Sequence, residues 1–137
     1  MNIPKKTKYK KYQKGHPAKG ISIRCNNLAF GKYGLKALKS GKITAKQIEA
    51  IRRTIMRKTK KLGKLWIRVF PDIPVSLKPA EVRMGKGKGN VEYWISKIKA
   101  GRILFELDNL SYIEAKNAFD SVKYKLPILT KFITKID

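Results

Sequence analysis

Positive charge dominates this 137-residue chain and is concentrated toward its beginning. Lys and Arg number 33 against 9 Asp and Glu, which gives a formal net charge of +24 at pH 7. Every charged side chain before Glu49 is basic, so this part of the chain has no nearby carboxylate to pair with. The isolated protein must therefore repel itself strongly at neutral pH. The sequence predicts a polyanionic partner, and a phosphate backbone suits it better than a membrane surface.

The length permits one domain with basic extensions and is too short for two ordinary domains. No apolar run approaches the roughly 20 residues of a membrane-spanning helix, so membrane insertion is not expected. Residues 1–17 lack the apolar stretch of a secretory signal, and Pro4, Gly15 and Pro17 would interrupt the amphipathic helix of a transit peptide. Cys25 is the only cysteine, which excludes an intramolecular disulfide.

Residues 1–20 predict an irregular basic arm, because Lys residues are spaced among Gly, Pro and Tyr without an apolar period. Residues 21–137 are expected to form one α+β domain. Within it, Ile21–Arg24 and Leu28–Leu38 carry β-branched and aromatic residues interrupted by glycine. This pattern predicts a strand pair or an irregular strand with bulges.

A helix is predicted to begin at Thr44, where Thr44 and Gln47 have the spacing of a capping box, and to end at Gly63. At about 100° per residue, its apolar and basic side chains fall on opposite faces. The face expected in the core consists of Ile48, Ile51, Ile55 and Leu62. The cationic face consists of Lys46, Arg53, Arg57 and Lys60.

Strands are predicted on both sides of a long connection. Lys64–Phe70 alternates with period two until Pro71, and residues 71–90 are expected to form an extended loop. Val91–Ile98 and Arg102–Leu107 then have the pattern of two further strands joined by a short turn. We interpret them as an antiparallel hairpin.

A second capping box, Ser111 with Glu114, predicts another helix, which Pro127 should end. Its buried face is expected to consist of Ala115, Phe119, Val122 and Leu126. The opposite face is mixed in charge and is assigned no role. A final strand is predicted at Leu129–Ile133.

The segment Arg83–Gly89 is the most unusual stretch of the chain. Its residues are Arg83, Met84, Gly85, Lys86, Gly87, Lys88 and Gly89. Alternating glycines allow the backbone to approach a ligand closely, and the cations suit phosphate. The spacing fits neither a P-loop nor a dinucleotide loop. Nucleic-acid contact is therefore favoured, with a merely flexible, soluble loop as the alternative.

Two groups of aromatic residues receive different interpretations. Tyr9 and Tyr12 lie in an arm that offers no core, so stacking on RNA or insertion into a groove is favoured. Aromatic residues within alternating strands more often belong to the core, although base stacking is the alternative. This second group consists of Trp66, Phe70, Tyr93 and Trp94.

Catalysis is not expected, because His16 is the only histidine and lies in the arm. Metal ligands are too few for a metal site, and no cofactor is expected. Glu106 and Asp108 would project from the same face of a strand. We interpret them as a solvated rim and not as an acid-base pair.

The chain contains three long stretches, Ile43–Ala50, Gly63–Asp72 and Arg83–Gly89, and three shorter ones, Pro4–Lys8, Phe30–Lys36 and Lys131–Ile133. Together these stretches closely resemble, in the same order, the bacterial-type family of large-subunit ribosomal protein sixteen. The resemblance implies a hammerhead-like α+β fold with a mostly antiparallel sheet and two helices. It also implies docking on large-subunit rRNA near the peptidyl transferase centre, next to neighbouring ribosomal proteins.

The resemblance further implies that the segment Arg83–Gly89 reaches toward A-site tRNA, while the arm enters rRNA. Residues expected to bind rRNA are Lys5, Lys6, Lys8, Tyr9, Lys10, Lys11, Tyr12, Lys14, Arg24, Lys46, Arg53, Arg57 and Lys60. A free-standing basic RNA chaperone is the alternative function, because composition alone permits it equally.

The source of the chain is less constrained than its family. Lys78–Arg83 and Gly101–Glu106 look similar to mitochondrion-encoded members, and the lack of a presequence agrees with synthesis inside the organelle. The dominance of Lys over Arg and the segment Ile21–Asn27 depart from the usual bacterial pattern. We expect a mitochondrial ribosome, with a bacterial cytoplasm or a plastid as alternatives.

Overall fold

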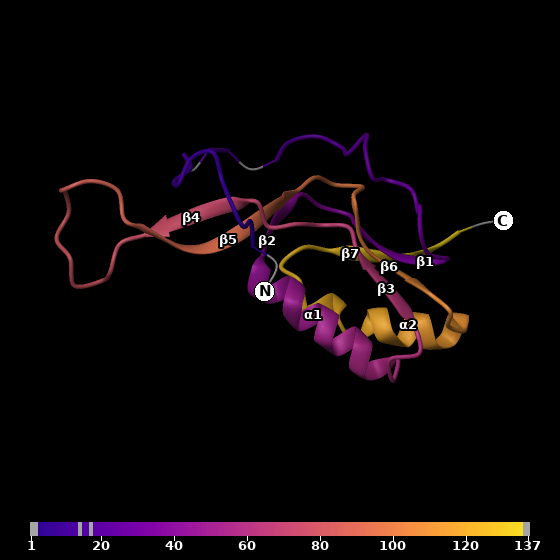
Figure 1. Ribbon diagram of the computed structural model, residues 1–137. Coiled ribbons are helices and arrows are strands. Elements are labelled where there is room, and N and C mark those ends of the chain that lie inside the picture. The colour runs from indigo at the N-terminus through magenta and orange to yellow at the C-terminus, as the bar shows by residue number, and fades with distance from the viewer. Residues whose placement is uncertain (1–2, 14, 17, 136–137) are drawn as a thin grey trace.

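The computed structural model describes residues 3–13, 15, 16 and 18–135, and within them the chain forms seven strands and two α-helices (Figure 1). In chain order the elements are β1 (Tyr33–Ala37), β2 (Gly41–Thr44), α1 (Ala45–Lys58), β3 (Lys64–Ile67), β4 (Ile73–Leu77), β5 (Asn90–Ile98), β6 (Ile103–Asp108), α2 (Tyr112–Asp120), the 3₁₀ helix η1 (Lys123–Lys125) and β7 (Thr130–Thr134). The predicted α+β class is confirmed. There are, however, two antiparallel sheets, ordered β3-β6-β1-β7 and β2-β5-β4.

Helix α1 begins as predicted. The Thr44 side chain accepts a hydrogen bond from the Gln47 backbone N–H, and the Gln47 side chain accepts one from the Thr44 N–H, which completes the capping box. Ile48, Ile51 and Ile55 are buried, so the apolar face was identified correctly. This helix therefore joins the core along the stripe that its period indicates.

The predicted end of α1 was wrong. The helix stops at Lys58, and Lys60 and Lys61 adopt positive φ angles of 49° and 65°. Leu62 consequently lies beyond the helix and is 70% exposed. A left-handed backbone usually ends a helix at glycine, and here lysines adopt that conformation before Gly63 is reached.

The expected hairpin between β5 and β6 was also wrong, because these strands belong to different sheets. β5 pairs with β2 and β4, whereas β6 pairs with β1 and β3. Between them Gly101 has a φ of 86°, and its N–H donates to the Ala37 carbonyl at the end of β1. The apolar residues of β6 gain burial on both faces of the larger sheet, which a two-stranded hairpin would not provide.

Strand β4 lies inside the segment predicted as a loop, so the irregular parts of residues 71–90 are residues 71–72 and 78–89. Proline donates no backbone hydrogen bond, so Pro74 is compatible with an edge strand but not with a central one. β4 is an edge strand of the order β2-β5-β4, where one side of the backbone needs no partner. The preceding strand is shorter than predicted and ends at Ile67.

Residues 21–38 contain only one strand, β1, with a register irregularity against β6 between Leu35 and Lys36. Ile21 forms an isolated bridge with Ala100. The predicted strand content of residues 21–32 was therefore too high. The bulge in β1 agrees with the irregular strand that the glycine pattern indicated.

The second half of the core follows the prediction more closely. Helix α2 has the Ser111–Glu114 capping box, and Ala115 and Phe119 are buried. The helix ends at Asp120, so Val122 and Leu126 are buried from the segment that follows it. The final strand, β7, is confirmed within one residue of its predicted bounds.

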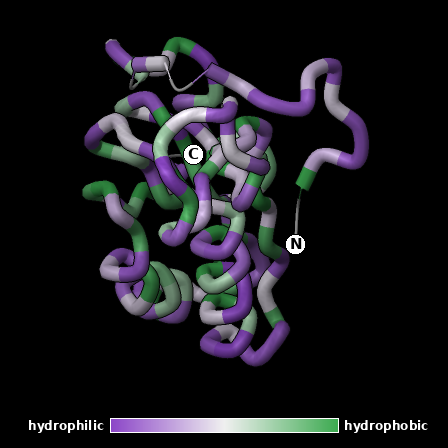
Figure 2. The backbone as a smooth tube through the Cα atoms, turned by 90° about the vertical axis from the view of Figure 1, so that its left-hand side faces the viewer, coloured by the Kyte–Doolittle hydropathy of each residue, from purple (hydrophilic) through white to green (hydrophobic). Residues whose placement is uncertain are grey.

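The hydrophobic core lies between the four-stranded sheet and the two helices, while the arm runs outside it and is drawn largely in hydrophilic colours (Figure 2). Its largest fully buried side chains include Phe105 of β6 and Phe119 of α2. Among the described residues, neither helix has the length and hydropathy needed to cross a membrane.

Candidate nucleic-acid interface

The Gly-Lys tip, residues Arg83–Gly89, projects from the end of the β4–β5 hairpin, far from the helices (Figure 1). Gly85 and Gly87 have φ angles of 103° and 91°, and a side chain at either would meet no neighbouring atom. Glycine is thus favoured there by backbone conformation and not by lack of space. Met84 is 99% exposed, and all residues of the tip except Gly89 are exposed.

The arm, residues 1–20, contacts the base of this tip. Lys11 Nζ donates to the Lys88 carbonyl at 2.9 Å, and Lys88 Nζ donates to the Tyr12 carbonyl. Two lysines thus exchange hydrogen bonds with backbone oxygens and not with carboxylates. Segments that lie 76 residues apart in sequence thereby form one basic surface.

The predicted arm residues are mostly exposed. Tyr9 and Tyr12 are 71% and 50% exposed, and neither belongs to the core. The other exposed residues of the predicted set in this part of the chain are Lys5, Lys6, Lys8, Lys10 and Arg24. Lys14 lies outside the described residues. The arm therefore presents the cations and rings needed to meet a nucleic acid.

The cationic face of α1 is exposed, but it is not purely cationic. Lys46, Arg53 and Arg57 are all exposed, as is Lys60 just beyond the helix. Glu49 accepts hydrogen bonds from Arg52 and Arg53, which lower the pKa of its carboxyl to about 2. The charge of Arg53 is partly matched within the helix, so it is a weaker candidate for phosphate binding than Arg57.

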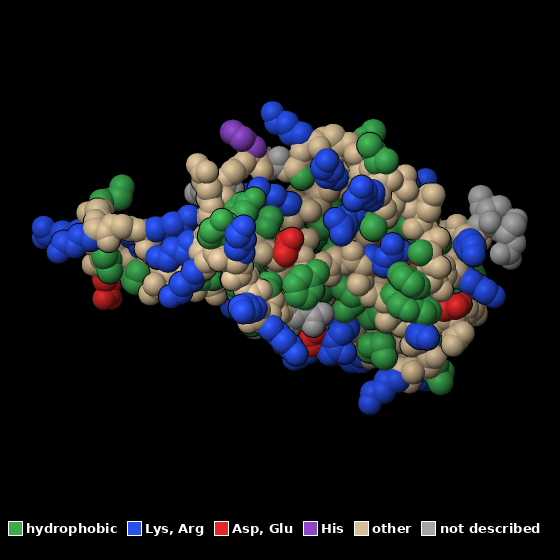
Figure 3. Space-filling model, turned by 45° about the horizontal axis from the view of Figure 1, so that its top comes forward, with side chains coloured by type: hydrophobic (Ala, Val, Ile, Leu, Met, Phe, Trp, Pro, Cys, Tyr) green, Lys and Arg blue, Asp and Glu red, His purple; other side chains and the backbone are tan. Residues whose placement is uncertain are grey.

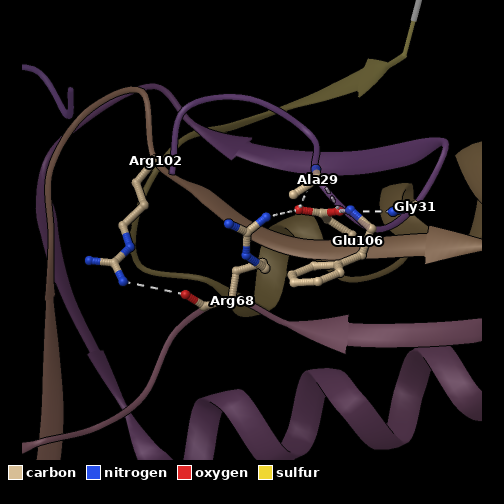
Figure 4. Close-up of polar contacts among 6 residues, drawn as sticks. Ala29, Gly31, Arg68, Arg102 and Glu106 are labelled. Carbon is tan, nitrogen blue, oxygen red and sulfur yellow. Dashed lines mark hydrogen bonds and ion pairs between the residues drawn. The ribbon is translucent and has the colours of Figure 1, made fainter. Parts of the chain in front are cut away.

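Glu106 was interpreted as part of a solvated rim, and this was wrong. Its side chain is fully buried in β6 and accepts hydrogen bonds from the N–H groups of Ala29, Phe30 and Gly31 and from Arg68 (Figure 4). Burial raises the carboxyl pKa, but these hydrogen bonds outweigh burial and hold the pKa below its usual range. Glu106 thus fixes the loop before β1 and neutralises Arg68.

The aromatic residues of the strands are not core residues in the strict sense. Trp66, Tyr93 and Trp94 are half-buried, and Phe70 is 46% exposed. Trp66 stacks against Phe30, with 6.0 Å between ring centroids. The core interpretation was wrong for Phe70, which lies beyond the end of β3, where the predicted alternation no longer applies.

Lys and Arg side chains spread over the tip and much of the surface shown in Figure 3, with few acidic side chains between them. The described part of the chain holds no group of three or more His, Cys, Asp or Glu residues placed to bind a metal ion. The fold and this surface define a basic, single-domain α+β protein whose exposed cations suit a polyanion.

Comparison with known proteins specifies the class further. The family model described as ribosomal protein L16p/L10e matches residues 4–133, and the chain belongs to this family. The chain is 57% identical over 135 residues to the large ribosomal subunit protein uL16 of Erythrobacter litoralis, covering 98% of this chain and 93% of that one. The proteins of the same name from Wigglesworthia glossinidia brevipalpis and Rhodospirillum rubrum are 52% and 51% identical, each covering 99% of this chain and 98% of the relative. The family resemblance found in the sequence is confirmed.

Proposed function

We propose that this chain is a structural constituent of the large ribosomal subunit, where it binds rRNA near the peptidyl transferase centre and contacts neighbouring ribosomal proteins. The arm and the exposed cations of α1 hold the rRNA. The Gly-Lys tip helps to position aminoacyl-tRNA in the A site. The chain contributes no catalytic group to this work.

The observation that carries the proposal is the contact between the arm and the tip. Lys11 and Lys88 approach each other's segments with only backbone carbonyls as acceptors. Concentrated, unmatched cations repel one another, and a phosphate backbone relieves that repulsion while releasing its condensed counterions. The same contact lets rRNA bound by the arm influence where the tip lies.

Sedimentation tests this function against a free-standing RNA chaperone. In a lysate at moderate salt, we expect the protein to sediment with large subunits and to remain there through a second gradient. A chaperone that binds by charge alone would spread over all RNA in the lysate. Recovery mainly at the top of the gradient, or equally on all RNA-containing fractions, would exclude a structural role in the subunit.

We further propose the mitochondrial ribosome as the location. The support is the resemblance of Lys78–Arg83 and Gly101–Glu106 to mitochondrion-encoded members. The relatives named above come from bacteria and do not favour the organelle over a bacterial cell. Immunodetection in large subunits from purified mitochondria is the expected result. Detection only in plastid or bacterial ribosomes would replace the location without changing the function.

A further inference from the structure

A cavity of about 290 Å³ lies between the arm and the three-stranded sheet. Alternate residues of β2 and β5 line it, so it opens on one face of the sheet. From the other side it is bounded by the arm residues Tyr12 and Gln13 and by Lys88 of the Gly-Lys tip. The cavity therefore exists only where arm, sheet and tip meet.

The charges around this cavity are all positive. Lys42 of β2 and Lys88 line it, and Lys97 of β5 is the direct cross-strand partner of Lys42. Like charges directly opposite each other in a sheet are destabilising. The cavity lining contains no Asp or Glu that would offset this cost. An anion bound between these lysines would remove the repulsion.

A hydroxyl group without a partner lies in the same wall. Ser76 lines the cavity, and its Oγ is buried without a hydrogen-bond partner among the described residues. The register of β4 against β5 shifts between Val75 and Ser76. Such a bulge re-aims side chains, and as a result consecutive residues of β4 line one cavity. Ser76 thus adds a polar residue to a wall that β4 otherwise lines with Ile73, Pro74 and Val75.

Two tyrosines add a stacking surface. Tyr93 lines the sheet side and Tyr12 the arm side, and Lys97 Nζ lies 5.7 Å from the Tyr12 ring centroid. Unpaired RNA bases stack on aromatic rings of this kind. The volume is near the lower end of small-ligand pockets, roughly 300 to 1,000 Å³, and so suits one nucleotide and not a duplex.

We propose that this cavity binds a single unpaired nucleotide of RNA. Its phosphate lies among Lys42, Lys88 and Lys97, and its base lies against the two tyrosines. The site rests on the proposed function, because it specifies which RNA feature the arm and sheet recognise. A second cavity, of about 370 Å³, is lined by Glu92 and therefore suits a phosphate less well.

The test uses the full chain and two RNA probes of equal charge, hexauridylate and a ribose-phosphate hexamer without bases. Fluorescence anisotropy at fixed salt should show tighter binding of hexauridylate, by about fivefold or more. Tyr12→Ala should remove most of that preference. Tyr124→Ala is the matched control, because Tyr124 is an exposed tyrosine with a lysine over its ring but lies outside the arm and does not line the cavity.

A lysine pair separates a ligand site from a structural role. Lys42→Gln with Lys97→Gln should keep or raise the melting temperature, because the cross-strand repulsion is gone, yet weaken hexauridylate binding. The salt slope should fall by about 0.7 for each phosphate that the variant no longer neutralises. Lys39→Gln, which changes an exposed lysine outside the cavity, should alter neither the base preference nor the melting temperature.

Equal affinity for the two hexamers would overturn the nucleotide site, and so would equal loss of preference in the Tyr124 and Tyr12 variants. Either result leaves the proposed function intact if the protein still sediments with large subunits. Loss of that sedimentation in the unaltered protein would instead contradict the proposed function itself.

Discussion

The two sheets of this protein differ in whether their charged side chains have a counter-charge nearby. In the four-stranded sheet, the buried carboxylate of Glu106 is matched by Arg68 and three backbone N–H groups. In the three-stranded sheet, Lys42 faces Lys97 with no acid in the adjoining cavity. The carboxylate of the first arrangement is matched within the chain, whereas the lysines of the second have no carboxylate in the lining of the cavity. Internal pairing thus supports the fold, and the unmatched charge lies in the part for which we propose RNA binding.

The largest effect on folding is expected in the hydrophobic core between the four-stranded sheet and the two helices. Ile51 is fully buried on α1, so Ile51→Asp places an unpaired charge in the core and should lower the free energy of unfolding by about 4 kcal/mol or more. The matched change is Arg53→Glu with Arg57→Glu on the exposed face, which should leave the fold intact and weaken assembly into subunits. Circular dichroism and urea unfolding would check both. Similar loss of helical signal in the two variants would mean that the faces of α1 are assigned wrongly.

A smaller but still large effect is expected for Glu106→Gln. The amide nitrogen cannot accept the hydrogen bonds that the carboxylate accepts, and Arg68 loses its counter-ion. Breaking a buried ion pair in this way should lower the free energy of unfolding by about 3 kcal/mol. Glu81→Gln, at an exposed carboxylate, should change it by less than about 0.5 kcal/mol. Urea unfolding at pH 7 measures both, and equal stabilities would show that the buried pair contributes nothing.

The same carboxylate should give the fold a dependence on acid. The pKa of Glu106 is lower in the folded protein than its usual value near 4.3, so its stabilising contribution is complete above that value. The contribution is lost as pH falls from about 4.3 through the folded pKa. Thermal unfolding between pH 6 and pH 3 should therefore show a steeper loss in the unaltered protein than in Glu106→Gln. Parallel curves would assign the acid sensitivity to other carboxyl groups.

Local sequence signals predicted the helix starts correctly but did not predict which strands pair with each other. Both capping boxes were predicted correctly, because the groups that satisfy each other lie within three residues. The partner of β5 was not, because period two identifies a strand without identifying its neighbour. β4 was missed because Pro74 opposes a central strand, and its edge position depends on the whole sheet.

In the candidate site, too, features of short segments could be predicted from the sequence, whereas features that depend on long-range contacts could not. Exposed arm lysines and the glycine-rich tip follow from composition and backbone freedom, which are properties of short segments. The Glu106–Arg68 pair joins residues 38 apart, and the cavity joins the arm to three strands. A sequence offers one signal for the first, an acid within the apolar run Ile103–Leu107. The sequence offers no signal for the cavity, because Lys42 and Lys97 become cross-strand neighbours only through the register of β2 against β5.

The smallest effect on stability, and the clearest effect on function, is expected from the Gly-Lys tip. Leu77 pairs with Asn90 across β4 and β5, so replacing residues 78–89 with Asn-Gly creates a two-residue hairpin turn of a favoured type. No residue of the removed segment is buried, and the melting temperature should change by no more than about 4 °C, which corresponds to about 1 kcal/mol in a domain near this size. Large subunits carrying this variant should assemble but bind aminoacyl-tRNA in the A site on the order of tenfold more weakly, because the donors to its phosphates are absent.

The control keeps the loop length and removes only charge, through Arg83→Gln, Lys86→Gln and Lys88→Gln. If both variants lose tRNA binding, the positive charge of the tip is responsible. If only the shortened variant loses it, the length of the loop is responsible. Normal tRNA binding by both variants would show that the tip is only a solvated loop. Failure of the shortened chain to fold would show that residues 78–89 contribute to the stability of the domain.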